Sequence, residues 1–217
     1  MLAFDTTTSA LSIAFRHQGQ LFQHTELAPS QHAKQFLPAL HALLQQAQVG
    51  LADFTTLAVT HGPGTFTGVR TGISMAQGLA LGTSLSVLGI SSLMALAEKA
   101  HRLTGATRVV TTLDARQQAL YWAAFERNAL GQWNSHLPEE LVLPTAVPLP
   151  RWHIPYTVIG TGIAPYKPLL KARLRGDTVF LEDPYPEAQD VLSLASWSAE
   201  KSMAPALLTP VYHRMPV

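Results

Sequence analysis

The first hundred residues alternate short apolar runs with amphipathic stretches, the rhythm of an α/β domain. Apolar or alternating positions over 1–5, 11–15 and 21–22 predict three strands, with a turn at 18–20. A helix is predicted next, over 31–48. Its apolar residues recur at helical spacing: Ala33, Phe36, Leu37, Leu40, Leu43, Leu44 and Ala47.

Pro38 lies inside this helical pattern. An interior proline costs about 3 kcal/mol in a regular helix, so we expect a kink or a late helix start there. The pattern then continues in the same α/β rhythm. Its predicted elements are a strand at 55–61, a helix at 68–81, a strand at 86–90 and a helix from Ser91 or Ser92 to about 101.

The second half has a weaker pattern. Asp114–Arg116 is expected in a turn between two strands, and the proline-rich stretch 137–155 is expected to hold loop, an edge strand and one short helix. Its predicted regular elements are strands at 108–113, 120–126 and 156–159 and a helix at 187–201.

Residues 62–72 read Gly-Pro-Gly-Thr-Phe-Thr-Gly-Val-Arg-Thr-Gly and lie between a predicted strand and a predicted helix. Glycine permits positive φ and close backbone approach, and Thr65 or Thr67 is a candidate N-cap. A helix N-terminus after such a turn suits an anion, but the spacing fits neither known phosphate-binding glycine motif and has no lysine. We favour close packing of strand, turn and helix over anion binding.

A second polar turn follows the first strand, where Asp5, Thr6, Thr7 and Thr8 stand together. Their hydroxyls can donate to an anion, whereas an aspartate in this place can also cap its own hairpin, which we favour. A strand, a hydroxyl-rich turn and a returning strand resemble the first hairpin of an actin-like (ASKHA) ATPase lobe, where such a turn faces nucleotide phosphates. These four residues are therefore our candidate vestigial phosphate loop.

With both segments in place, the chain resembles the TsaB (YeaZ) branch of the glycoprotease-like TsaD family. The glycine block is the most specific match. The matching segments are Phe4–Thr7, His32 with Leu37-Pro38, 62–72, Asp114–Arg116 with Tyr121-Trp122, Gly160–Gly162 and 210–214. The resemblance implies a two-lobed ASKHA (ribonuclease H-like) fold of mixed sheets flanked by helices. We expect an N-terminal lobe at 1–103 and a smaller, degenerate lobe at 104–217.

The resemblance also bears on catalysis. The TsaD branch binds its metal through a His-x-x-x-His pair on the first long helix, but here His32 is followed at the second position by Phe36. None of the nine histidines stands three or four residues from another. We therefore predict no metal, no cofactor and no catalytic residue, and an inactive paralogue rather than an enzyme.

In this family the first two long helices form the interface with TsaD or with a second copy of the chain. The helix over 68–81 is apolar nearly all round, which independently indicates burial on two sides. The predicted partner-binding residues are His32, Phe36, Leu40, Leu43, Gly72, Met75, Leu79 and Gly82.

The resemblance thus implies a scaffold subunit of the tRNA threonylcarbamoyladenosine machinery. It would bind and activate TsaD, accept TsaE on the heterodimer, form a homodimer when alone and contact tRNA weakly or indirectly. The rival hypotheses are a metallopeptidase-like or ATP-dependent ASKHA enzyme acting alone, and a homodimeric interaction module with no role in tRNA.

Composition limits the remaining choices. Only 13% of the 217 residues are charged, against about 25% in a typical protein, while 47% are hydrophobic. The net charge of +1 gives no general case for nucleic-acid binding, and the basic residues Lys167, Lys171, Arg173 and Arg175 are typical of a solvated helix face. There is no cysteine, no secretory leader pattern and no apolar run of the ~20 residues that span a bilayer. We expect a cytoplasmic protein without membrane contact.

Overall fold

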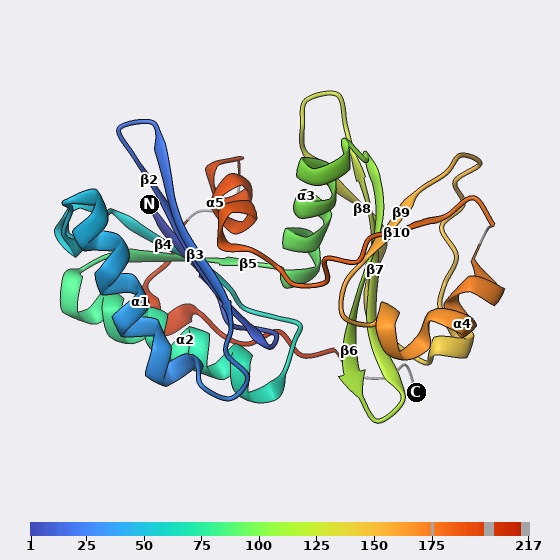
Figure 1. Ribbon diagram of the computed structural model, residues 1–217, viewed down its shortest axis with the longest axis horizontal. Coiled ribbons are helices and arrows are strands. Elements are labelled where there is room, and N and C mark those ends of the chain that lie inside the picture. Colours follow the sequence, from blue (N-terminus) through green and yellow to red (C-terminus); the bar gives the residue numbers. More distant parts are fainter. Residues whose placement is uncertain (175, 198–201, 214–217) are drawn as a thin grey trace. The chain divides into compact units, whose positions relative to one another are not determined.

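The computed structural model describes residues 1–174, 176–197 and 202–213 (Figure 1). Its contacts group the chain into two compact units. The first contains Met1–Ala95 and Pro186–Val211, and the second contains Leu96–Tyr185 and the segment from Tyr212 onward. The division into lobes at 1–103 and 104–217 stays a prediction. The contacts do show that chain beyond residue 185 returns to the first unit.

The first unit is built on a five-stranded mixed sheet in the order β3-β2-β1-β4-β5. The first three strands pair antiparallel, whereas β1, β4 and β5 pair parallel. All four residues of β1 are buried, because helices cover both faces of the sheet. The strands are β1 Leu2–Asp5, β2 Ala10–His17, β3 Gln20–Leu27, β4 Thr56–Thr60 and β5 Ser86–Ile90.

Helices α1 (His32–Ala47) and α2 (Phe66–Thr83) pack on one face of this sheet, and α5 (Ala188–Trp197) packs on the other. The alternation along β1 decides which side chain meets which layer, since Phe4 faces α1 and α2 while Ala3 faces α5. Helix α1 begins at His32 and includes Pro38, so of the two alternatives expected there the late start was wrong, and the kink stays a prediction. A short 3-10 turn, Leu51–Asp53, leads into β4.

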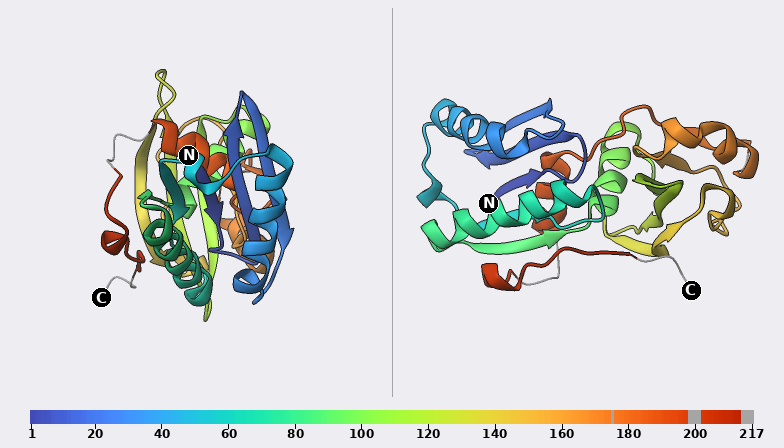
Figure 2. Two further views of the ribbon diagram at one scale, coloured as in Figure 1. Left: turned by 90° about the vertical axis from the view of Figure 1, so that its left-hand side faces the viewer. Right: turned by 90° about the horizontal axis from the view of Figure 1, so that it is seen from below.

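The C-terminal segment of the first unit runs beside α2 and β5 (Figure 2). Met203 pairs with Val87 on β5, which is otherwise an edge strand. The Gln77 Nε2 donates to the carbonyl oxygens of Pro205 and Leu208, each at 3.2 Å, and the Leu208 side chain is buried in the core beside α2. This segment therefore covers part of an exposed strand edge and completes the core.

The second unit is built on a sheet in the order β10-β9-β6-β7-β8, with β6, β9 and β10 parallel and β6, β7 and β8 antiparallel. Trp122 on β7 is fully buried, and its indole N–H donates to the Pro148 carbonyl at 3.1 Å. Helix α3 (Ser92–Thr104) begins in the first unit and belongs to the second from Leu96 onward. The other elements of the second unit are β6 Arg108–Arg116, β7 Ala119–Arg127, β8 Trp133–Val142, a 3-10 turn at Pro144–Ala146, β9 Thr157–Ile159, α4 Ile163–Arg173 and β10 Val179–Phe180.

The two five-stranded mixed sheets with their flanking helices confirm the predicted α/β fold. Four details differ from the sequence prediction. Asp114–Arg116 belongs to β6 and its bulge, because the residues after it (117 and 118) take positive φ and make the turn. Strand β8 starts earlier than the edge strand expected within 137–155, and α4 and β10 were not predicted. The predicted helix over 187–201 reaches Trp197, beyond which 198–201 lie outside the described residues. None of the helices in the described ranges is long and apolar enough to cross a membrane.

Candidate functional site

The turn after β1 forms its hydrogen bonds with residues of the first unit. The carboxylate of Asp5 is fully buried and accepts hydrogen bonds from the backbone N–H of Thr7 at 3.3 Å, the Thr7 hydroxyl at 2.7 Å and the Thr60 hydroxyl at 2.5 Å. These bonds offset the cost of burying a charged group. The favoured interpretation, an aspartate that caps its own hairpin, is therefore confirmed by the geometry.

The glycine block packs directly against this turn. The Thr6 hydroxyl donates to the Gly68 carbonyl at 2.8 Å, and the Thr65 N–H donates to the Thr7 carbonyl at 2.7 Å. A Cβ added to Gly64 would lie 2.4 Å from the Thr7 carbonyl oxygen, and one added to Gly68 would lie 2.2 Å from that of Thr6. The glycines are therefore needed because two backbones touch here. Thr65 is the N-cap of α2, one of the two predicted candidates, and accepts from the Gly68 N–H at 3.2 Å.

The burial of the turn after β1 determines which of its polar groups a ligand could reach. Asp5, Thr6 and Thr7 are completely buried and Thr8 nearly so. The hydroxyls of Thr6 and Thr7 donate within the chain, not outward. Phosphate binding by Asp5–Thr8 stays a prediction, and in this conformation the turn acts as a structural junction between β1 and α2.

In the second unit, Gly160 and Gly162 also permit close contact between two backbone segments. Gly160 has φ of +126°, and a Cβ there would lie 1.8 Å from the Thr112 carbonyl oxygen. Thr161 accepts a hydrogen bond from the Asp114 N–H at 3.0 Å. The Gly160–Gly162 loop thus binds the end of β6 to the start of α4 by close backbone contact.

Helices α1 and α2 also present an outer surface, with an open groove of about 550 Å³. Ala33 of α1 and Phe66, Thr67, Arg70, Thr71, Ser74 and Met75 of α2 line it. The Arg70 guanidinium lies 3.4 Å from the centre of the Phe66 ring, a cation–π contact one helical turn apart. We call this surface the α1/α2 face; it comprises Ala33, Leu37, Phe66, Arg70, Ser74, Met75, Gly78, Leu81 and Gly82.

Three large apolar side chains of the α1/α2 face are exposed to solvent. Leu37 is 60% exposed, Phe66 63% and Leu81 79%. The groove and these side chains form an apolar surface of small and large residues on two adjacent helices. Such surfaces rimmed by polar groups are typical of protein–protein contacts.

The structure distributes the eight predicted partner-binding residues over both sides of these helices. Four from α1 and Gly72 of α2 are buried in the first unit, Met75 and Leu79 are half-buried, and Gly82 is exposed. The periodic apolar stripe in the sequence is thus the stripe that packs on the sheet. Small residues on the opposite side of α2, above all Ser74 and Gly78, were the signal for the outer surface. The four buried α1 residues are His32, Phe36, Leu40 and Leu43.

His32 is a buried histidine rather than part of a ligand cluster. Burial lowers its pKa, partly offset by a hydrogen bond to the backbone of Ala10, and its Nε2 has no hydrogen-bond partner in the described part of the chain. At the next turn, Phe36 packs edge-on against Phe4, with ring centres 4.8 Å apart. Within residues 1–174, 176–197 and 202–213, no three His, Asp or Glu side chains gather in a way that could hold a metal ion.

We expect His32 to make the first unit less stable in mild acid. Its folded pKa lies below the unfolded value of about 6.5, so the unfolded state binds more protons as pH falls, and stability declines below that value. Urea unfolding of the wild type and His32→Asn between pH 8 and pH 5 measures this. The variant should lose part of the decline, and an identical pH dependence in both proteins would contradict the assignment.

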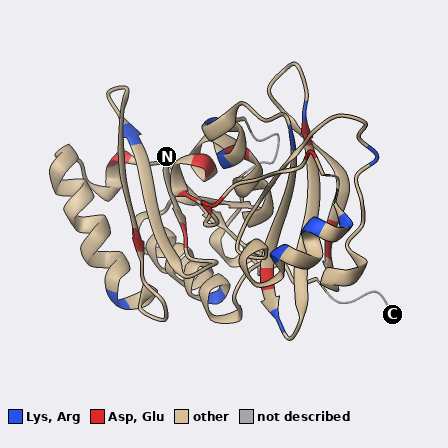
Figure 3. Cartoon of the chain, turned by 45° about the vertical axis from the view of Figure 1, so that its right-hand side comes forward, with Lys and Arg blue, Asp and Glu red and all other residues tan. Residues whose placement is uncertain are grey.

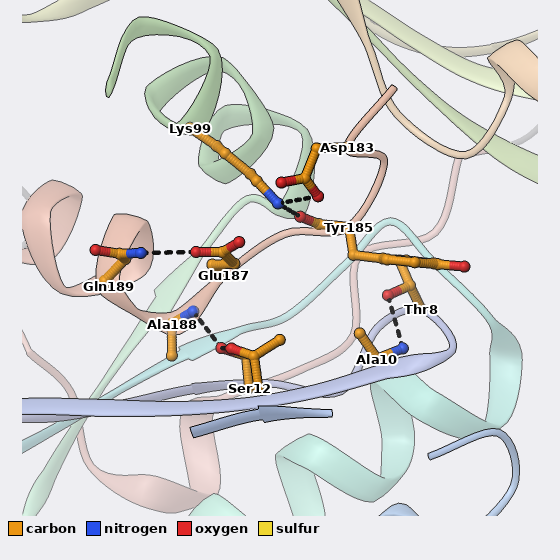
Figure 4. A network of polar contacts seen from close by, with 10 residues as sticks. Thr8, Ala10, Ser12, Lys99, Asp183, Tyr185, Glu187, Ala188 and Gln189 are labelled. Atoms are coloured by element: carbon orange, nitrogen blue, oxygen red, sulfur yellow. Dashed lines mark hydrogen bonds and ion pairs between the residues drawn. The ribbon is translucent and has the colours of Figure 1, made fainter. Parts of the chain in front are cut away.

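A buried lysine holds the chain that follows β10 (Figure 4). Lys99 of α3 is 1% exposed; its ammonium contacts the Asp183 carboxylate at 2.5 Å and donates to the Tyr185 carbonyl at 2.9 Å. Within the first unit, the Ala188 N–H at the start of α5 donates to the Ser12 hydroxyl at 2.8 Å. These contacts position a connecting segment, and the lysine charge is neutralised by its carboxylate partner.

Comparison with known proteins decides the family. The model of a family described as TsaD, tRNA N6-adenosine threonylcarbamoyltransferase, matches residues 24–202. A relative from Escherichia coli, the tRNA threonylcarbamoyladenosine biosynthesis protein TsaB, is 38% identical over 99% of this chain and 94% of its own length. The chain belongs to the TsaB family. A Haemophilus influenzae TsaB is 33% identical, with 99% of this chain and 93% of the relative covered.

Solved structures of the TsaB family agree. YeaZ from Pseudomonas aeruginosa superposes with a TM-score of 0.89 at 34% identity, covering 97% of this chain and 98% of its own. A Pseudomonas aeruginosa protein described as similar to peptidase YEAZ gives 0.88 at 35% identity, with 98% of each chain covered. The sequence resemblance to this family is confirmed, and with it the two-sheet TsaD-like fold.

Proposed function

We propose that this chain is the non-catalytic scaffold subunit of the machinery that makes threonylcarbamoyladenosine in tRNA, and that it acts by binding and activating TsaD. The exposed apolar α1/α2 face carries the proposal, because a chain with so few charges gains stability when a partner covers such a surface. Nearly full-length similarity to proteins named for this biosynthesis supports it.

Two features favour a scaffold over an enzyme acting alone. The buried Asp5 carboxylate and the Thr7 hydroxyl hydrogen-bond to each other within the lobe. The position four residues after His32 is a core phenylalanine, which cannot ligate a metal. We infer that transfer of the threonylcarbamoyl group belongs to TsaD in the cytoplasm. TsaE docks on the heterodimer, the chain alone forms a homodimer, and any contact with tRNA is weak or indirect.

Size-exclusion chromatography with light scattering tests the proposal. The 23.5 kDa chain is analysed alone and mixed with TsaD from the same organism. We expect a 1:1 complex that replaces any homodimer, and TsaD activity on tRNA that depends on this complex. Separate elution of the two proteins, or full TsaD activity without the chain, would reject it. Low-micromolar ATP binding by the isolated chain, or metal-dependent peptidase activity, would instead favour the enzyme alternative.

A further inference from the structure

The last segment of the first unit is held to β5, to α2 and to the residue after β4 by hydrogen bonds. We call residues 202–211 the C-terminal strap. Both backbone groups of Met203 pair with Val87 of β5, at 2.8 and 3.0 Å. A glutamine of α2 donates to two carbonyls in the middle of the strap, and the Val211 N–H donates to the His61 carbonyl at 2.9 Å. The strap therefore occupies a site for an extended peptide.

The site leaves space for one anchoring side chain of the strap. Among the strap residues, all of which the structure describes, only Leu208 is fully buried, at 2% exposure, whereas its neighbour Leu207 is 66% exposed. A Cβ added to Gly89 of β5 would lie 2.7 Å from the His61 Nδ1 and 3.1 Å from the Leu208 Cδ1. One added to Gly62 would lie 2.9 Å from the last carbonyl oxygen of the strap. Backbone hydrogen bonds and one buried anchor are the means by which proteins bind extended peptides.

The strand edge that the strap covers has no charge of its own. Strand β5 is at the edge of its sheet and reads Ser-Val-Leu-Gly-Ile, without a charged residue or a proline. Edge strands usually carry such residues, because these residues prevent pairing with another chain. The strap is uncharged too, and both segments are tan in Figure 3. The strap therefore protects this edge, and its release would expose backbone groups that can pair with an extended peptide.

The strap is held more loosely than a strand of the sheet. In the described ranges its strand pairing is the single pair of Met203 with Val87, and half of its ten residues are exposed. Segments with few buried apolar side chains open locally at a lower free energy than the whole domain unfolds. The strap has the contacts of such a segment, since Leu208 is its one fully buried side chain.

We infer that the C-terminal strap opens as a unit while the rest of the first unit stays folded, and that the vacated site binds an extended peptide with a leucine anchor. In the closed state the strap is the intramolecular ligand of this site, so it blocks the binding of any other peptide. Release needs neither TsaD nor tRNA, and the strap device is therefore independent of the scaffold function proposed above.

Native-state hydrogen exchange of the full chain, followed by NMR, measures the release. The amides of Val87 and Val211 are bonded at opposite ends of the strap, and the Phe4 amide lies in β1 at the centre of the sheet. Val87 and Val211 should share one opening, populated at least about a hundredfold more than the opening that exposes Phe4. Leu208→Ala should speed exchange of both strap amides at least about tenfold, because it removes the anchor between them, whereas Leu207→Ala should stay within about twofold of the wild type.

A peptide added in trans tests the vacated site. A fluorescein-labelled peptide of residues 202–211 is titrated into the full-length wild type and into full-length Leu208→Ala, with fluorescence anisotropy as the readout. The wild-type strap competes at an effective concentration of about millimolar, so the peptide should bind Leu208→Ala at least about tenfold more tightly than the wild type. The same peptide with its own Leu208→Ala change should bind that host at least about tenfold more weakly.

Four results would overturn the inference. The strap amides could exchange only together with Phe4, or Val87 and Val211 could respond differently to Leu208→Ala. The wild-type peptide could bind Leu208→Ala no better than it binds the wild type. If Leu208→Ala loses protection at Phe4 altogether, the first unit cannot stay folded without its strap, and a releasable strap is wrong.

Discussion

Replacing Gly68 by alanine is expected to lower the free energy of unfolding by about 3 kcal/mol or more, whereas Gly78→Ala in the same helix should raise it by about 0.5–1 kcal/mol. A Cβ on Gly68 would lie 2.2 Å from the Thr6 carbonyl oxygen and 2.5 Å from the Thr65 hydroxyl oxygen. Neither α2 nor the β1 turn can retreat without breaking the hydrogen bonds that join them. At Gly78 nothing lies within 4 Å of the added carbon, so only the helix-propensity gain remains.

Urea unfolding followed by far-UV circular dichroism compares the two variants, with the transition midpoint as the readout. Because both changes add one methyl group to α2, any general effect on the helix cancels between them. Equal midpoints for Gly68→Ala and the wild type would show that the glycine block is not required for packing. Anion binding would then be favoured over close packing as the reason for that glycine block.

Two neighbouring residues of α1 should separate stability from partner binding. Phe36→Ala should cost about 3–5 kcal/mol, because the ring is fully buried and packs on Phe4. Leu37→Ala should change stability by no more than about 0.5 kcal/mol, since that side chain is 60% exposed, yet weaken TsaD binding about tenfold.

The measurements are urea unfolding and titration against TsaD at a temperature where both variants stay folded. Folded Phe36→Ala should retain TsaD affinity within a few-fold of the wild type. A large affinity loss in folded Phe36→Ala with none in Leu37→Ala would reverse our assignment of the two sides of α1.

Much of the fold was predictable because the first unit follows elementary patterns. Every strand predicted in the first hundred residues is present, and α2 begins two residues before its predicted start. Hydrophobic periodicity reports burial against the sheet, and five of the seven apolar residues in the predicted α1 stripe pack in the core, whereas Ala33 and Leu37 are exposed. The same periodicity could not distinguish residues that pack in the core from residues on the outer surface of the helices. The surface that we propose for partner binding contains small residues such as Ser74 and Gly78 and has no strong apolar repeat, whereas Phe36 and Leu40 belong to one.

The second unit was harder to predict for physical reasons. Helix α4 contains Pro168, and its weak amphipathic pattern gives little signal. Strand β10 has only two residues, too few for alternation to be visible. The bulge after Asp114 depends on residues in the left-handed region, which sequence alone does not distinguish from an ordinary turn. The buried contacts of Lys99 with Asp183 and Tyr185 join residues more than 80 positions apart, and no local pattern reports them.

The return of the chain to its first sheet has a consequence during synthesis on the ribosome. Strands β1–β5 emerge early, but the α5 layer and the buried Leu208 come from the last quarter of the chain. The second unit is almost continuous in sequence and can close sooner. Until Pro186–Val211 has been translated, one apolar face of the first sheet stays uncovered, and exposed apolar surface of this kind makes a folding intermediate prone to aggregate. The first unit, whose strands are synthesised first, therefore completes its folding last.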